Sequence, residues 1–160
     1  PLQLATATMI LANNGTGYAP HLLKKIKQPN QKTQELPKSP LKSVRLTQGS
    51  HWETITHAMQ QVVLHGTGFR FGHPTAYTVA AKTGTAQLVS RDTLKAQALH
   101  EHTRSLEDHS LFIAFAPINK PTIALAIIVE HQAFAPLVAR AILDAYFLKK
   151  PHPHDVQEHE

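Results

Sequence analysis

Four consecutive residues near the middle of the chain, Lys82-Thr83-Gly84-Thr85, bring together an amine, two hydroxyls and a glycine. They interrupt the stretch YTVAAKTGTAQLV, whose first half has the composition of a β-strand. A positive lysine and two hydroxyls suit a substrate carboxylate, and Gly84 leaves room for a peptide to lie against the strand. Backbone N–H groups at such an edge can also stabilise a tetrahedral oxyanion. Strand alternation puts Lys82 and the threonines on opposite faces, so we expect the site at the strand's edge.

The same residues also fit a purely structural strand end, in which Gly84 marks a β-bulge and the threonines reflect β-propensity. A phosphate-binding loop is excluded, because that motif needs glycines where this chain has Ala76 and Ala81, and a helix after the lysine. The triplet Lys-Ser/Thr-Gly arises by chance in roughly one chain in ten of this length. The surrounding elements must therefore decide between acyl transfer and a structural role.

Composition indicates one globular unit, because the chain has 160 residues of which 42% are hydrophobic. Its longest apolar stretches, at 111–116 and 123–129, are too short to cross a bilayer. There is no cysteine, so disulfide and thiolate chemistry are excluded. Much of the net charge of +5 lies between Lys24 and Arg45. A solvated loop is the favoured interpretation, an anionic polymer or membrane headgroup is the alternative, and nucleic acid is disfavoured because no stacking aromatics are interleaved.

The first half of the chain predicts two helices separated by an exposed basic loop. Helical spacing extends from Pro1 to about Asn14 and ends at Asn14-Gly15, with a buried stripe of Leu2, Leu4, Ala5, Met9, Leu11 and Ala12. The segment YAPHLLKKI is a candidate short strand, and the residues up to Pro40 read as a loop. Ser50-His51-Trp52-Glu53 is a capping box, and its helix has Ile55, Met59, Val62 and Val63 as the predicted buried face.

The second half predicts three strands and a terminal helix. After YTVAAKTGTAQLV comes a long polar excursion at 90–110, then LFIAFA and TIALAIIVE form a hairpin covered on both faces. Pro136 opens a helix that Lys149-Lys150 and Pro151 close, and its predicted buried face is Leu137, Ala141, Ile142 and Ala145. Trp52 and Tyr146 are expected to pack in the core. The fold class is therefore α/β (α+β), an antiparallel sheet with helices packed on it, over residues 1–150, followed by a disordered tail at 151–160.

Three segments carry a family resemblance in the correct order: PLQLATATMILANNGTGYAPHLL, VVLHGTGFRFGHPTAYTVAAKTGTAQ and DHSLFIAFAPINKPTIALAIIVEH. KTG after a strand is the third signature of penicillin-recognising serine enzymes. The whole resembles the C-terminal half of the transpeptidase domain in class B high-molecular-mass penicillin-binding proteins. The details are most similar to the subgroup that serves elongation in rod-shaped bacteria. The implied fold is that of penicillin-binding transpeptidases and serine β-lactamases.

The resemblance implies roles for the four residues and for partners. Lys82 would be catalytic, Thr83 and Thr85 would bind the carboxylate of a peptidoglycan stem peptide or a β-lactam, and Gly84 would complete the substrate-binding strand. The N–H of Thr85 would be half of the oxyanion hole. The implied reaction is acylation of a serine by a D-alanyl-D-alanine stem and transfer to a neighbouring amine, with no metal or organic cofactor. A membrane glycosyltransferase is an implied partner, and the periplasmic face of the bacterial inner membrane is the implied location, with the anchor upstream.

The nucleophilic serine of that family stands in a Ser-x-x-Lys long before KTG, and no suitable copy is present here. Ser39-Pro40-Leu41-Lys42 fits the pattern but lies in the Pro-rich loop with no helix after it, and Ser90-Arg91-Asp92 resembles the middle motif in the wrong order. We therefore expect the serine on an upstream half cut before Pro1, and expect this chain alone to be inactive and poorly stable.

Three other functions remain open. A non-catalytic binding module would keep this fold without the chemistry, and a serine β-lactamase or sensor would share the strand. A zinc site is the third, because His100, His102 and His109 cluster in the excursion and His152, His154 and His159 lie in the tail. Without an accompanying cysteine, solvated histidines are the expectation, so no metal site is predicted.

Overall fold

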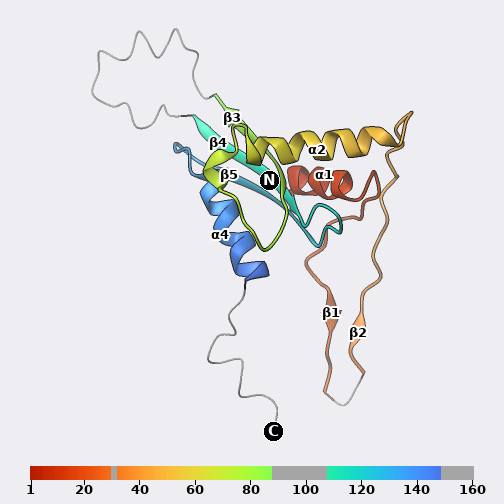
Figure 1. Ribbon diagram of the computed structural model, residues 1–160. Coiled ribbons are helices and arrows are strands. Elements are labelled where there is room, and N and C mark those ends of the chain that lie inside the picture. The colour runs from red at the N-terminus through yellow and green to blue at the C-terminus, as the bar shows by residue number, and fades with distance from the viewer. Residues whose placement is uncertain (30–31, 88–107, 149–160) are drawn as a thin grey trace.

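A computed structural model describes residues 1–29, 32–87 and 108–148. Its centre is a three-stranded antiparallel sheet of β3 (Ala80–Ala86), β4 (His109–Ala116) and β5 (Ile123–Val129), in the order β3-β4-β5 (Figure 1). Two helices, α1 (Leu2–Ala12) and α2 (Ser50–Leu64), pack on the sheet, and α4 (Ala135–Phe147) packs on it from the other side. This arrangement confirms the predicted fold class.

The predicted hairpin of β4 and β5 is confirmed, with β4 beginning at His109 rather than at Leu111; within the described residues β4 is the interior strand and β5 is an edge strand, so the expectation of two interior strands holds for β4 alone. Successive side chains of a strand point to opposite faces. Phe112 and Ala114 are fully buried in the cluster that includes α4, whereas Phe115 is buried in the cluster with Met59 of α2. β4 is thus apolar along its length because both of its faces are covered.

Helix α1 forms where its sequence predicts, but its buried stripe differs from the prediction. Leu2 is 64% exposed and Leu4 is also exposed, while Thr8 is the buried residue of the helix. Thr8 tolerates burial because its hydroxyl donates a 2.7 Å hydrogen bond to the Leu4 carbonyl one turn earlier. The predicted stop is confirmed: Asn14 and Gly15 have φ of 50° and 92°. A Cβ at Gly15 would lie 2.0 Å from the Val44 carbonyl oxygen, so only glycine fits there.

Helix α2 also forms as predicted, without the predicted capping box. Gly49 is the N-cap and Ser50 is already helical, so no side chain caps the helix; the Ser50 carbonyl instead accepts a 3.1 Å bond from the Thr54 hydroxyl. Met59 and Val63 are buried as expected, whereas Ile55 is exposed. The buried face is therefore confined to the C-terminal half of α2, which lies against β3.

The basic segment between the two helices is exposed, as predicted, and contains a short two-stranded ladder. β1 (Lys25–Ile26) pairs antiparallel with β2 (Gln34–Glu35), and Tyr18 and Pro40 form an isolated bridge at the base. The candidate strand in YAPHLLKKI is thus limited to two residues. Figure 1 shows this hairpin extending away from the three-stranded sheet.

The predicted buried face of the C-terminal helix was wrong. Ala135, Pro136, Ala139 and Leu143 of α4 are buried, whereas Ala141 and Ala145 are exposed, Leu137 is 47% exposed and Ile142 is 42% exposed. Tyr146, expected in the core, is half exposed and packs edge-on against Phe147 with ring centroids 4.9 Å apart. Trp52 is half-buried. The residues expected to close α4, and the tail predicted at 151–160, lie outside the described residues.

Candidate active-site strand

β3 changes character halfway along its length. Ala80 and Ala81 are completely buried, since they lie between α2 on one side and the α4 cluster on the other. From Lys82 onward the strand emerges: Lys82, Gly84 and Thr85 are exposed and Thr83 is half-buried. The polar residues that interrupt the strand pattern therefore occupy the part of β3 that extends beyond the core.

β3 is an edge strand within the described part of the chain, because β4 is its one paired neighbour there. In the antiparallel register Lys82 lies opposite Ile113, Thr83 opposite Phe112 and Thr85 opposite Ser110. Paired residues share a face, so Lys82 and the two threonines are on opposite faces of the sheet, as expected. Within the described part of the chain, the four residues singled out from the sequence therefore lie on an edge strand.

The Lys82 side chain turns back onto its own strand. Its Nζ atom donates a 2.7 Å hydrogen bond to the carbonyl oxygen of Thr83. The ammonium therefore lies beside the exposed backbone of β3, where its charge adds to the local hydroxyl donors. An anionic group approaching the strand edge would meet this charge.

Gly84 and Thr85 follow at the end of the strand. A Cβ at Gly84 would lie 3.3 Å from the Cβ of Leu111 on β4, a tight contact. Opposite Thr85, the Ser110 hydroxyl accepts a 3.2 Å bond from the Ala135 backbone N–H at the start of α4. This end of β3 is thus paired with β4, which the start of α4 in turn contacts through Ser110.

One hydroxyl beside β3 was not anticipated from the sequence. Thr67 Oγ1 lies 2.6 Å from Thr83 Oγ1, although 16 residues separate the two threonines. The flanking glycines of GTGFRFG predicted a loop, and no feature of spacing related that loop to β3. The structure therefore adds one residue to the four that the sequence singled out.

Residues 1–146 match the sequence profile of the penicillin binding protein transpeptidase domain. The chain belongs to this family. The match covers almost all of the described residues and confirms the resemblance inferred from the three sequence blocks.

Named relatives of the transpeptidase domain agree with this assignment. The chain is 33% identical over 154 residues to the peptidoglycan D,D-transpeptidase MrdA of Escherichia coli strain K12, covering 92% of this chain and 24% of the relative. The crystal structure of Pseudomonas aeruginosa PBP2 in complex with WCK 5153 superimposes with a TM-score of 0.68 at 34% identity, covering 94% of this chain and 30% of that chain. An imipenem acyl-enzyme complex of Mycobacterium tuberculosis penicillin-binding protein A superimposes with a TM-score of 0.67 at 25% identity, covering 93% and 31%. The chain thus spans about a quarter of the length of the curated relative it matches.

A hydrogen-bonded group connects the segment that precedes β3 with α4. The Tyr77 hydroxyl donates to Asp144 Oδ1 at 2.5 Å, and Arg140 Nε donates to Asp144 Oδ2 at 2.7 Å. Burial and the bond to Asp144 raise the pKa of the Tyr77 hydroxyl. The bond from Tyr77, supported by Arg140, lowers the pKa of Asp144. Arg140 Nη1 also donates to the Phe71 carbonyl at 3.3 Å.

The rejected serine motifs are not organised for catalysis in the described residues. Ser39 is exposed in an extended segment, where its carbonyl accepts a 2.8 Å bond from the Ala19 N–H, and it does not begin a helix. The second motif, at residues 90–92, lies outside the described residues.

The histidine cluster considered for zinc falls mostly outside the described residues, since His100, His102 and the tail histidines are not described. His109, at the start of β4, accepts a 3.2 Å bond at Nδ1 from the His131 backbone N–H, and the two rings meet edge-on. Over residues 1–29, 32–87 and 108–148, no group of three potential ligands is close enough to hold a metal.

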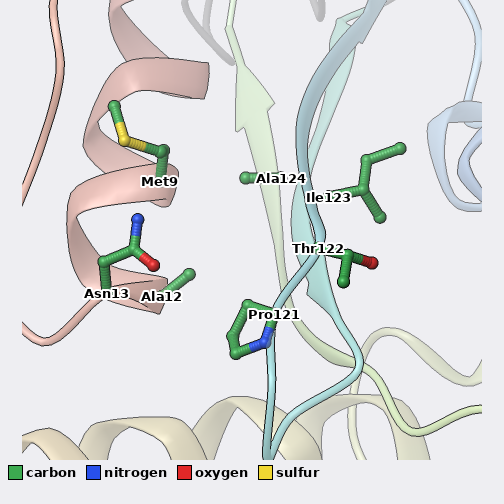
Figure 2. A pocket seen from close by; sticks show the side chains of 7 residues that line it. All are labelled: Met9, Ala12, Asn13, Pro121, Thr122, Ile123 and Ala124. Carbon is green, nitrogen blue, oxygen red and sulfur yellow. The ribbon is translucent and has the colours of Figure 1, made fainter. Parts of the chain in front are cut away.

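A small cavity of about 90 Å³ lies between α1 and the start of β5 (Figure 2). Its walls include Met9 of α1 and the C-cap residue Asn13 on one side, and Thr122 and Ile123 on the other. No titratable side chain lines it, so it offers no acid or base for acyl transfer.

Among the described helices, none is long and apolar enough to span a membrane.

Proposed function

We propose that this chain supplies the substrate-binding strand of a peptidoglycan D,D-transpeptidase that cross-links stem peptides through a serine acyl-enzyme and binds β-lactams. The observation that carries the proposal is the exposed half of β3, where Lys82, Thr83 and Thr85 lie just beyond a buried core, on a strand edge that has no second paired strand among the described residues. Membership of the transpeptidase family supports it.

In the proposed reaction the stem peptide lies along the edge of β3. Its terminal carboxylate is bound by the hydroxyls of Thr83 and Thr85 and by the charge of Lys82. A serine oxygen attacks the carbonyl of the penultimate D-alanine, the terminal D-alanine leaves, and a neighbouring amine then attacks the ester. The Thr85 N–H contributes one donor to the developing oxyanion. A β-lactam undergoes only the first step: the serine opens its lactam ring, and the opened ring stays attached to the serine as an acyl-enzyme.

The serine belongs, on this proposal, to an upstream half of the same protein, which is also the main partner of this chain. Two features of the described residues support such a partner. β5 is the second edge of the sheet, with β4 as its one paired neighbour among them, and α4 exposes an apolar face that contains Leu137 and Ile142. Unpaired strand edges and contiguous apolar surface are characteristic of contact sites.

The proposal also includes a cellular location and a partner enzyme. The protein acts on the periplasmic face of the bacterial inner membrane, with its anchor upstream of this chain, and works beside a membrane glycosyltransferase. The proposal includes no nucleic-acid partner, because the basic residues of the β1–β2 hairpin are not interleaved with stacking aromatics.

Covalent labelling tests this proposal. The full-length protein that contains this chain is incubated with a fluorescent penicillin, digested, and the labelled peptide is identified by mass spectrometry. We expect a label on a serine outside residues 1–160. A label on Ser39 would overturn the assignment of the nucleophile, rapid release of hydrolysed penicillin would favour a β-lactamase, and complete absence of label would favour a non-catalytic module.

A further inference from the structure

We infer that Thr67 is a positioning residue for the carboxylate-binding hydroxyl of Thr83, an inference that rests on the proposed function. The two Oγ1 atoms are 2.6 Å apart, a normal hydroxyl–hydroxyl hydrogen bond. Thr67 lies outside β3, in the loop between α2 and the short 3₁₀ helix Phe69–Phe71. It therefore brings a second element of the fold to the substrate-binding strand.

The chemistry of hydroxyls gives this contact a direction when a carboxylate is bound. A threonine hydroxyl has one proton to donate and lone pairs to accept with. An ionised carboxylate only accepts, so Thr83 must give it its proton. Thr67 is then the donor to Thr83 Oγ1, which holds the Thr83 hydroxyl toward the ligand and strengthens its own donation.

The loop that carries Thr67 is fixed against the end of α2. The Gly68 N–H donates a 2.9 Å bond to the Val62 carbonyl. A Cβ at Gly66 would lie 2.9 Å from Val62 Cα, and one at Gly68 would lie 2.9 Å from the Val62 oxygen. The glycines on both sides of Thr67 thus allow the close approach of loop to helix that sets its hydroxyl beside β3.

The close packing of this loop against Val62 explains why glycines stand on both sides of Thr67. Replacing either glycine would push the loop off Val62 and move the Thr67 hydroxyl. Thr67 does not need to touch the ligand, because it acts through Thr83.

The test measures the second-order rate of acylation of the full-length protein by a fluorescent penicillin. We expect Thr67→Val to slow labelling about fivefold, the loss of roughly one hydrogen bond, and Thr67→Ser to keep most of the rate. Because Thr67 acts through Thr83, the double variant Thr67→Val/Thr83→Val should be no slower than Thr83→Val alone. The matched control is Thr54→Val, which removes an exposed α2 hydroxyl bonded within its own helix.

A second readout separates positioning from general destabilisation. The methyl ester of the same penicillin lacks the carboxylate, so Thr67→Val should reduce the rate with the acid but not with the ester, at an unchanged melting temperature. Equal rates for wild type and Thr67→Val, or multiplicative effects in the double variant, would overturn the inference while leaving the proposed function intact. A wild-type protein that no penicillin labels would overturn both. A Thr83→Val variant that labels at the wild-type rate would overturn the inference together with the carboxylate-binding role proposed for Thr83, while labelling of the serine would still support the acyl-transfer function.

Discussion

Tyr77 donates a 2.5 Å hydrogen bond to Asp144, a residue 67 positions later in the sequence. Tyr77 lies three residues before β3, and Asp144 lies in the last turn of α4, where Arg140 also binds it. The Tyr77 ring stacks on Phe147 with centroids 4.7 Å apart. This contact therefore links the segment that precedes β3 with the C-terminal helix.

Removing the Tyr77 hydroxyl should break the hydrogen bond to Asp144 while the aromatic ring stays packed on Phe147. We expect Tyr77→Phe to lower the free energy of unfolding by about 1 kcal/mol, because a buried hydrogen bond is lost and Asp144 keeps Arg140. Hydrogen exchange of the full-length protein should show faster exchange in α4 and in residues 72–79. The control is α1, whose exchange should not change. Uniform acceleration over the whole domain would contradict a local link.

The Asp144 pKa predicts a pH dependence of that link. Folding lowers the pKa of this carboxyl below its usual value of about 4. The ionised form is thus favoured in the folded state, so its contribution to stability is present above about pH 4 and is lost as the pH falls through the lowered pKa.

Thermal unfolding of the full-length protein at several pH values measures this contribution. Wild type should exceed Asp144→Asn in melting temperature at pH 7, and the difference should shrink as the pH is lowered toward about 3. A difference that stays constant, or grows, over that range would mean that the charge of Asp144 does not contribute.

The sequence predicted the order of the elements better than the faces they bury. β4 and β5 were identifiable because strands covered on both faces are apolar throughout. In α4, by contrast, Ala139 and Leu143 lie on one apolar stripe and Leu137 and Ala141 on another, each pair four residues apart. Periodicity does not choose between two such stripes.

In the candidate site too, some features could be predicted from the local sequence and others depend on tertiary packing. Lys82 and the threonines on β3 are neighbours in the chain, so strand alternation alone placed them on opposite faces of one edge. Thr67 reaches Thr83 through the tertiary packing of the loop on α2, which no local pattern encodes. The predicted capping box also does not form, since helix α2 begins one residue earlier than the motif requires.

Gly84 is expected to be needed because β4 is close behind it. Gly84→Ala should slow acylation of the full-length protein, since its Cβ would crowd Leu111 at 3.3 Å and displace the strand, with a cost of about 1 kcal/mol. If crowding is the cause, adding Leu111→Gly, which removes the crowded Cβ atom, should recover part of the rate. A double variant as slow as Gly84→Ala would instead indicate that the new methyl group obstructs the substrate directly.

The exposed apolar face of α4 should be buried in the full-length protein. We expect Ile142→Glu to lower its free energy of unfolding by about 2 kcal/mol, because the proposed upstream half would cover this side chain. The control Ile26→Glu changes a comparably exposed isoleucine on β1, at a position not assigned to the contact. Equal effects of the two substitutions would argue against a covered α4 face.

The central claim is that Lys82 and its strand bind the group that acylates the serine. The most direct measurement is the rate of fluorescent-penicillin labelling of the full-length protein with Lys82→Ala, compared with Lys120→Ala, an exposed lysine in the β4–β5 turn. We predict that Lys82→Ala loses labelling by a factor of about 100 or more, since a charge-assisted contact made at the reacting centre is removed, while Lys120→Ala labels normally. Labelling of Lys82→Ala at the wild-type rate would contradict the account.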